Sequence, residues 1–295
     1  MQKKLLLVVN PISGRGIIKD HLLAIIQRLS LAGYEVSVYP TKAKGDAITK
    51  MEVGNQYDLI IASGGDGTLN EVITGIVVAD VDTPIGYLPA GTTNDFAANL
   101  NIPKNVYKAL DICLNGNQLA IDIGQFNNHY FTYVAAFGAF TDVSYETPQT
   151  RKNLLGGFAY LIEGLLKLST IQSYHCKITY GDHQLEDQYI LGLISNSDSL
   201  AGLKNVFGNS ADLNDGLFEV TLIRAPKSIV DIHRILTDFL NKKYDPDYVD
   251  VFRTDTLTIE SDEEMKWTLD GENGGALKSV QIKSLKQRIK ILVKN

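Results

Sequence analysis

The stretch Leu59-Ile60-Ile61-Ala62-Ser63-Gly64-Gly65-Asp66-Gly67-Thr68-Leu69-Asn70-Glu71 decides the fold. Its uninterrupted apolar start predicts a buried strand, and the apolar spacing over 68–78 predicts a helix directly after the glycine-rich turn. Three glycines within four positions cost more backbone entropy than a connecting turn requires. We therefore expect the backbone here to be brought close to a ligand.

Strands and helices alternate through the first part of the chain. Apolar runs at 5–9, 35–39, 59–62 and 84–88 predict strands, and helical spacing predicts helices over 17–31, 45–53, 68–78 and 106–114. This order favours a doubly wound α/β domain over residues 1–125, with parallel strands covered on both faces.

The pattern changes after about residue 125. Alternating segments at 130–136, 175–180, 189–195 and 218–223 predict antiparallel strands, interrupted by helices at 154–168 and 227–240. We expect a second domain over 126–295, a β-sandwich with helical insertions whose last residues can return to the first domain.

Composition limits the function classes. The 295 residues carry 28 Lys+Arg against 34 Asp+Glu, and the resulting net charge of −6 disfavours nucleic-acid binding. No apolar run is long enough for a signal peptide or a membrane span. Cys113 and Cys176 lie far apart, which predicts two buried thiols in a reducing cytoplasm, and the histidines lack zinc-ligand spacing.

Two further loops share the design of the first. The segment Asn10-Pro11-Ile12-Ser13-Gly14-Arg15-Gly16 and the segment from Pro89 through Gly91, Thr92 and Asp95 to Ala97 each follow a predicted strand. Carboxyl ends of parallel strands share one edge, so three such loops suit a nucleoside triphosphate, although a strand-to-helix turn needs some glycines in any case. A dinucleotide fingerprint fails because its third glycine would fall at Lys19, and no Walker A sequence occurs.

Asp66 places a carboxylate where phosphates would lie. Two unit charges 4 Å apart interact by about 4 kcal/mol at an effective dielectric of 20, so this position requires a cation such as Mg²⁺ between them. The alternative is that Asp66 caps the helix.

Taken together, the motifs resemble a known family. Asn10-Pro-x-Ser-Gly-x-Gly16, Gly64-Gly-Asp-Gly-Thr-x-Asn-Glu71 and Pro89-x-Gly-Thr-Thr-Asn-Asp-Phe-Ala97 are similar to the diacylglycerol kinase catalytic domain, especially that of soluble bacterial lipid kinases. Asp122-x-Gly124, Asp212-Leu-Asn-Asp215-Gly-Leu217 and Asp270-Gly-Glu272 follow in the expected order. NAD kinases and phosphofructokinases share the Gly-Gly-Asp-Gly element, but the Gly-Thr-x-Asn-Asp segment and the late Asp-Gly-Glu favour lipid kinases. The resemblance implies a phosphofructokinase-like first domain.

The resemblance also implies site residues. It implies that Glu272 is the general base that accepts the proton of the lipid hydroxyl, with Asp270 nearby. It also implies that Asp66, Asp95 and Asp122 hold or orient the catalytic Mg²⁺, directly or through water. Asp-Gly is also a favoured hairpin turn, which is the alternative for Asp270. Asp212, Asp215 and the Leu217 carbonyl would hold a second, structural Mg²⁺, where an ordinary hairpin is the alternative. The implied ATP contacts are Asn10, Pro11, Ile12, Ser13, Gly14, Thr41, Gly65, Asp66, Gly67, Thr68, Leu69, Asn70, Glu71 and Thr92. For Thr41, which follows Pro40, the alternative is that it only begins a turn.

The implied activity is ATP- and Mg²⁺-dependent phosphorylation of diacylglycerol to phosphatidate, within phospholipid metabolism. The resemblance further suggests a cytoplasmic homodimer in transient contact with the membrane surface and no nucleic-acid partner. The alternatives are a sphingosine or ceramide kinase, then an NAD kinase, then a nucleotide-binding protein without turnover.

Overall fold

The computed structural model describes residues 2–92, 94–138, 172–196, 199–200, 203–204, 213–240 and 243–294. Two compact units form, one from Met1–Ile121 with Gln287–Asn295 and one from Asp122–Lys286. The chain first crosses between them after Ile121 rather than after residue 125, and its last residues belong to the first unit. The crossings occur within β5 (Asn117–Phe126) and β15 (Glu272–Val293).

A parallel sheet forms the centre of the first unit. Its strands are β1 (Lys3–Val9), β2 (Tyr34–Pro40), β3 (Leu59–Gly64) and β4 (Ile85–Pro89), in the spatial order β2-β1-β3-β4. The end of β15 lies beside β4 and runs parallel to it, with Ile291 opposite Ile85. Leu5 to Val9 are all buried, which confirms the prediction of strands covered on both faces.

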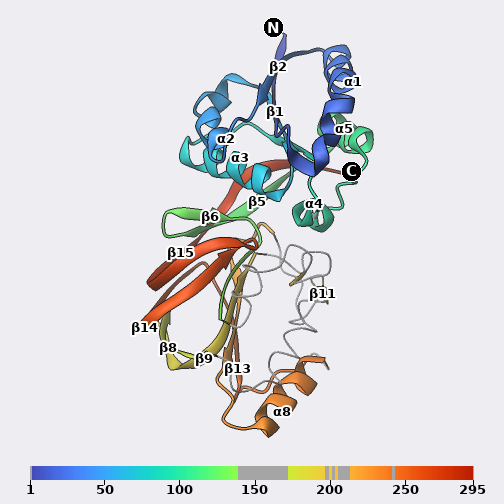
Figure 1. The fold of residues 1–295 in the computed structure, drawn as a ribbon. Helices are drawn as coiled ribbons and strands as arrows, with labels where there is room; N and C mark the ends of the chain where they lie inside the picture. Colours follow the sequence, from blue (N-terminus) through green and yellow to red (C-terminus); the bar gives the residue numbers. More distant parts are fainter. Residues whose placement is uncertain are drawn as a thin grey trace. The chain divides into compact units, whose positions relative to one another are not determined.

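Helices cover both faces of this sheet. One side carries α1 (Ile17–Leu31) and α5 (Val106–Asn115), and the other carries α2 (Asp46–Lys50) and α3 (Asp66–Val78) (Figure 1). Shorter elements are the 3₁₀ turns η1 (Ser13–Gly16) and η2 (Met51–Gln56) and helix α4 (Asp95–Asn99). The predicted helices of the first domain therefore exist, with 45–53 divided between α2 and η2.

The second unit is a β-sandwich of antiparallel strands. Its spatial order is β13-β12-β9-β7-β14-β15, with β8 pairing both β14 and β9, and with β5 pairing β6 and β15. The remaining elements of this unit are β6 (His129–Phe131), β7 (Val134–Gly138), β8 (Tyr174–Tyr180), β9 (His183–Ser195), β10 (Ser199–Leu200), β11 (Leu203–Lys204), β12 (Phe218–Arg224), α8 (Ile229–Leu240), β13 (Val249–Thr254) and β14 (Thr256–Leu269).

The strand predicted over 130–136 is two strands, β6 and β7. The prediction of one continuous strand was wrong because the amides of Thr132 and Tyr133 bind the Asp270 carboxylate instead of a neighbouring strand. The helix predicted over 154–168 lies outside the described residues.

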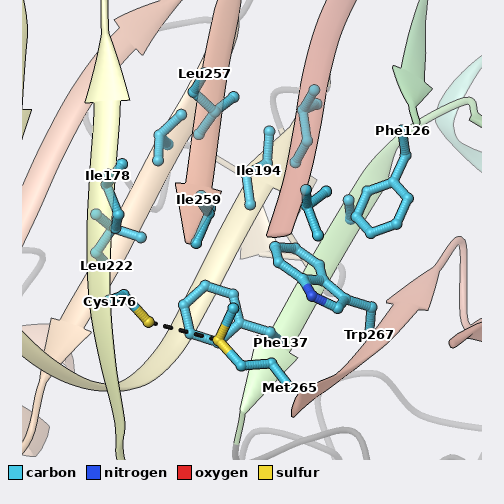
Figure 2. Close-up of a cluster of buried hydrophobic side chains, with 14 of the residues drawn as sticks. Phe126, Phe137, Cys176, Ile178, Ile194, Leu222, Leu257, Ile259, Met265 and Trp267 are labelled. Atoms are coloured by element: carbon cyan, nitrogen blue, oxygen red, sulfur yellow. Dashed lines mark hydrogen bonds between the residues drawn. The ribbon is translucent and has the colours of Figure 1, made fainter. Parts of the chain in front are cut away.

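The sandwich encloses an aromatic core. The only tryptophan, Trp267, lies between Phe126 and Phe137, with ring centroids 4.9 and 5.0 Å away (Figure 2). Alternation along β12 places Phe218, Val220 and Leu222 in this core. Ile223 faces the other way and packs against the buried side of α8.

Both cysteines are buried free thiols, as predicted. Burial raises the pKa of Cys113 to about 12 and that of Cys176 likewise to about 12. Neither thiol is a candidate nucleophile, because the thiolate is the reactive form.

Candidate functional site

The three glycine-rich loops of the first unit touch one another through their backbones. They follow β1, β3 and β4, whose carboxyl ends share one edge of the parallel sheet. A Cβ added at Gly91 would lie 2.5 Å from the Gly65 Cα, and one added at Gly14 would lie 1.8 Å from the Ala90 carbonyl oxygen. Gly14 also has φ +55, which favours glycine. These glycines are therefore required because the loops pack on one another.

Gly67 is different from those glycines. It is exposed in the first turn of α3, and a Cβ added there would meet nothing within 4 Å. The fold itself does not require glycine at this position. The helix amino terminus lies here, and its N–H groups suit an anion that approaches closely.

Asn10 connects the first loop to the start of α3. Its backbone N–H donates to the Ser63 carbonyl at 2.9 Å, and its Nδ2 donates to the Thr68 Oγ1 at 3.0 Å. Its Oδ1 accepts from the Ile12 N–H at 3.1 Å. Asn10 thus links the loop that follows β1 to the end of β3 and to the first turn of α3.

Asp66 is the first residue of α3, and Gly65 occupies the cap position, so the N-cap alternative for Asp66 is wrong. The Asp66 Oδ1 accepts from the Phe96 N–H at 3.3 Å, which joins α3 to the first turn of α4. The backbone of Asp95 begins that helix, and its side chain lies outside what the structure describes.

Glu71 and Thr41 take part in hydrogen bonds of the segment between β2 and α2. The Glu71 Oε1 accepts from the Gly45 N–H at 2.9 Å, and the Thr41 N–H donates to the Val9 carbonyl at 2.8 Å. The resemblance assigned Glu71 to ATP. In the structure, this carboxylate holds the segment between β2 and α2, which contains Thr41.

The remaining predicted nucleotide residues differ in exposure. The Leu69 side chain is buried, and the Asn70 Oδ1 accepts from Thr74 within α3, whereas Thr92 is exposed. Sequence reasoning assigned no role to buried Asn94, whose Oδ1 accepts from the Gly91 N–H at 2.9 Å and so shapes the third loop. The Gly-Thr-x-Asn spacing was the signal that could have identified it.

In the second unit, Asp270 and Gly271 form the two-residue turn between β14 and β15. Their φ values of 50° and 80° are those of a type I′ hairpin, so the turn interpretation is confirmed. Glu272 is the first residue of β15 and is exposed. The catalytic interpretation of Glu272 stays a prediction.

The Asp270 carboxylate fixes this turn to the segment between β6 and β7. Oδ2 accepts from the Thr132 N–H and Oγ1 at 2.7 and 2.8 Å, and Oδ1 accepts from the N–H groups of Tyr133 and Val134 at 3.0 Å each. Burial raises the pKa of Asp270, and the four hydrogen bonds oppose that rise. Asp270 thereby positions the residue two places later, Glu272.

Asp122 contacts the loop that contains Asp215 and Leu217, for which a structural Mg²⁺ was predicted. It is fully buried, its Oδ2 accepts from the Gly216 N–H at 2.6 Å, and its own N–H donates to the Leu213 carbonyl at 2.8 Å. In the motif Asp122-x-Gly124, glycine is required because a Cβ at Gly124 would lie 2.2 Å from the Phe131 ring.

Within that loop, Asp215 is paired with a cation of the protein itself. Its Oδ1 accepts from the Leu217 N–H at 2.8 Å, and its Oδ2 pairs with the Arg253 guanidinium. Arg253 also donates to the Glu219 Oε1 at 3.0 Å. Burial raises the pKa of Glu219 to about 7, Asp215 adds to the rise and Arg253 opposes it.

The described donors of this loop do not by themselves form a metal site. Asp212 lies outside the described residues. No group of three or more His, Cys, Asp or Glu side chains that could hold a metal ion occurs in the described part of the chain. Among the same residues, no helix has the length and apolar character that crossing a membrane requires.

Comparison with known proteins identifies relatives over the whole chain. The family described as the diacylglycerol kinase catalytic domain matches residues 4–126, and the family described as the YegS C-terminal NAD kinase β-sandwich-like domain matches residues 134–293. A Bacillus subtilis (strain 168) protein named diacylglycerol kinase is 35% identical, with 93% of this chain and 91% of the relative covered. A Staphylococcus aureus (strain JH9) protein of that name is 36% identical, with 94% and 88% covered.

A solved structure agrees. The crystal structure of a Bacillus anthracis protein, provisionally named diacylglycerol kinase, superposes with a TM-score of 0.82 at 25% identity, and the match covers 99% of this chain and 96% of that one.

Proposed function

Because the chain belongs to the diacylglycerol kinase catalytic-domain family, we propose that it transfers the γ-phosphate of ATP to the hydroxyl group of diacylglycerol and forms phosphatidate. The chain is a kinase. In the proposed reaction, the hydroxyl oxygen bonds to the γ-phosphorus, and the bond from that phosphorus to the β,γ-bridging oxygen breaks. The hydroxyl proton passes to a base, for which we propose Glu272.

The observation that carries this proposal is the joined set of loops at the edge of the parallel sheet. Asn10, Gly65 and Gly91 lie in loops that contact one another. Gly67 lies beside them in the first turn of α3, where the absence of a side chain leaves the backbone accessible. Backbone N–H groups at such an end can bind phosphate oxygens, because they lack intrahelical partners. The described residues therefore fit a nucleoside triphosphate.

Mg²⁺, when bound with ATP, neutralises phosphate charge in the transition state. We propose that Asp66, in the glycine-rich loop after β3, holds this ion directly or through water, with Asp95 as a further carboxylate. The resemblance also assigns Asp122 to this ion, but the Asp122 side chain is fully buried in the second unit and accepts from the Gly216 N–H. A second Mg²⁺ at Asp212, Asp215 and the Leu217 carbonyl would compete with Arg253 for the Asp215 carboxylate. A thermal midpoint that falls in EDTA without nucleotide would support this second ion, and an unchanged midpoint would argue against it.

Glu272 suits the role of base by its placement. It is exposed, and the preceding turn is fixed by the hydrogen bonds of Asp270, so its backbone position is defined. In phosphoryl transfer, a base mainly orients the attacking hydroxyl and accepts its proton.

The experiment is transfer of labelled γ-phosphate from ATP to diacylglycerol in mixed micelles, with and without Mg²⁺. Sphingosine, ceramide and NAD serve as alternative acceptors. We expect Mg²⁺-dependent label in phosphatidate, and label in another acceptor alone would refute the proposed substrate. Tight ATP binding without transfer to any acceptor would identify a binding protein.

The role of Glu272 has its own test. Glu272→Ala should lower turnover by roughly 10²-fold or more, because the variant lacks the general base that accepts the hydroxyl proton. The affinity for ATP should be unchanged. Glu264→Ala removes another exposed glutamate, from the adjacent strand β14, and should leave turnover unchanged. Near-normal turnover of Glu272→Ala would remove this residue from the mechanism.

The resemblance also carries proposals about context. We propose that the protein acts from the cytoplasm through transient contact with the membrane surface, where its lipid resides, and that it is a homodimer. Cosedimentation with diacylglycerol-containing vesicles tests the first proposal. Sedimentation equilibrium of the free protein tests the second.

A further inference from the structure

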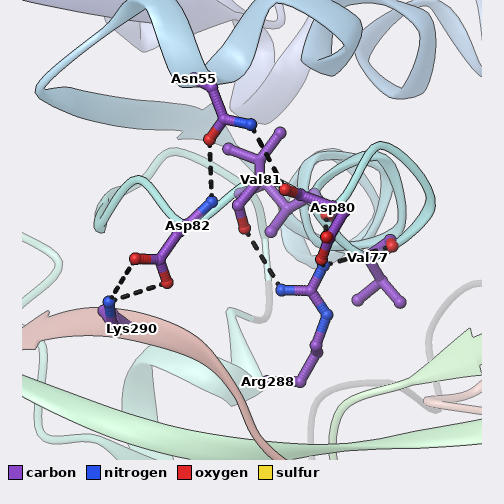
Figure 3. A network of polar contacts seen from close by, with 8 residues as sticks. Asn55, Val77, Asp80, Val81, Asp82, Arg288 and Lys290 are labelled. Carbon is purple, nitrogen blue, oxygen red and sulfur yellow. Dashed lines mark hydrogen bonds and ion pairs between the residues drawn. The ribbon is translucent and has the colours of Figure 1, made fainter.

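Arg288 binds the carboxyl end of helix α3. It lies near the end of β15, and its guanidinium donates to the Ile76 and Val77 carbonyls at 3.0 and 3.3 Å (Figure 3). It also donates to the Val81 carbonyl at 3.2 Å and to the Asp80 carboxylate at 2.9 Å. The last carbonyls of a helix have no intrahelical partner and carry partial negative charge, so a guanidinium is well suited to them.

The turn that follows α3 is conformationally unusual. Asp80 has φ 50, a left-handed conformation that glycine or asparagine normally occupies at this point, and the Val81 N–H closes the helix by donating to the Ile76 carbonyl at 2.9 Å. Asn55 contacts the turn from η2, where its Nδ2 donates to the Asp80 carbonyl and its Oδ1 accepts from the Asp82 N–H (Figure 3). Contacts from both sides therefore hold this helix end.

The strand that supplies Arg288 also contains a residue in an unfavourable backbone conformation. Gln287, the residue immediately before it, has φ 49 within β15. Non-glycine residues adopt this conformation rarely, and they keep it only where the surroundings impose it. Arg288 therefore binds one such residue, Asp80, and directly follows the other, Gln287. With its three backbone carbonyl acceptors, the contact is more than an ordinary surface ion pair.

The opposite end of α3 forms part of the proposed nucleotide site. The helix runs from Asp66 to Val78, and its first turn contains Gly67 and Thr68. We propose that Arg288 is a positioning residue for nucleotide binding, which fixes the far end of α3 and thereby holds its amino-terminal turn in register with the other two loops. This inference rests on the proposed function.

A helix transmits such a constraint because its hydrogen-bonded backbone moves as a rod. The 13 residues of α3 span about 20 Å. Along its length the helix packs closely on α2, since a Cβ at Gly75 would lie 2.6 Å from the Ile48 carbonyl oxygen. Release of the Arg288 end would leave α3 free to tilt about that contact, and its first turn would shift relative to Asn10.

The test compares Arg288→Met with Lys290→Met. Lys290 lies on the same strand and pairs with Asp82 at 2.7 Å, but it makes no described contact with α3 (Figure 3). We expect Arg288→Met to raise the Kd for a fluorescent ATP analogue and the KM for ATP by about 3- to 30-fold, the range for contacts that act through an intervening element, with the KM for lipid unchanged. Lys290→Met should leave both values for ATP unchanged.

Nucleotide binding is measured well below the thermal midpoint of each variant, so that loss of stability alone does not affect it. Arg288→Lys keeps the charge but loses the planar fork, and it should give an intermediate Kd. It also serves as the test variant if Arg288→Met does not fold. An unchanged Kd in both Arg288 variants, with normal binding by the unaltered protein, would overturn the inference and leave the proposed function intact. Failure of the unaltered protein to bind ATP would overturn both.

Discussion

Replacement of Asp270 by asparagine tests whether its carboxylate holds the hairpin that bears Glu272. Asparagine tolerates a φ of 50° and suits a type I′ turn, so the turn itself should persist. The carboxylate accepts from three backbone N–H groups and the Thr132 hydroxyl. In either amide orientation, at least one backbone N–H then faces an NH₂ group and loses its acceptor.

The expected cost follows from these contacts. An orphaned buried donor costs about 1–3 kcal/mol, and the other bonds weaken because they no longer reach a charged group, so we expect a loss of about 2–4 kcal/mol. Turnover should fall as well, since Glu272 directly follows the released turn.

The single tryptophan provides the assay. Trp267 is fully buried in the core of the second unit, three positions before Asp270, so urea unfolding followed by its fluorescence reports on that unit. Asp182→Asn, in the exposed turn between β8 and β9, is the matched control and should be neutral. Stability of Asp270→Asn within about 0.5 kcal/mol of the unaltered protein, the usual scatter of surface substitutions, would refute the reasoning.

Three further predictions concern other sites. The pKa of Glu219 is raised from 4.5 to about 7, so the folded state favours the neutral form of this side chain. The stability that this provides is complete below pH 4.5 and is lost as pH rises through about 7, with a total loss of about 3 kcal/mol. Glu219→Gln should remove that decline in urea unfolding measured from pH 4.5 to 8. Gly67→Ala should keep or slightly raise the thermal midpoint and weaken ATP binding in titrations, whereas Gly91→Ala should cost about 1–3 kcal/mol through overpacking. Glu71→Ala should raise the KM for ATP about 2- to 10-fold by releasing the Gly45 N–H, and Glu71→Gln, which keeps an acceptor oxygen, should stay near the original value.

The sequence predicted the first unit well because its signals are local. The apolar run at 5–9 is β1 with two more residues at its start, and the helix predicted over 17–31 is α1. Burial on both faces of a parallel sheet leaves no polar alternation, and the glycine-rich turns mark where each strand ends. In the second unit, the segments predicted at 175–180, 189–195 and 218–223 lie in β8, β9 and β12, whereas β13, β14 and β15 were not predicted.

The roles of single polar side chains could not be predicted in the same way. Local patterns identified Asp270 as a turn residue, but its acceptance of the Tyr133 N–H depends on a partner 137 positions away. Arg253 and Arg288 lie in ordinary strand sequence, and nothing local distinguishes them from the other arginines of the chain.

By itself, the sequence determined the order of strands and helices in the first unit, the glycine-rich loops and the family to which they belong, because hydrophobic periodicity and backbone freedom are properties of neighbouring residues. Only the tertiary structure decided three other features. It showed at which glycines two loops pack too closely for a Cβ, that the Glu71 carboxylate accepts from the Gly45 N–H, and that Arg288 binds the carbonyl groups at the end of α3. Such contacts join residues that are distant along the chain. Their geometry is fixed only when the packed core brings donors and acceptors within about 3 Å of one another.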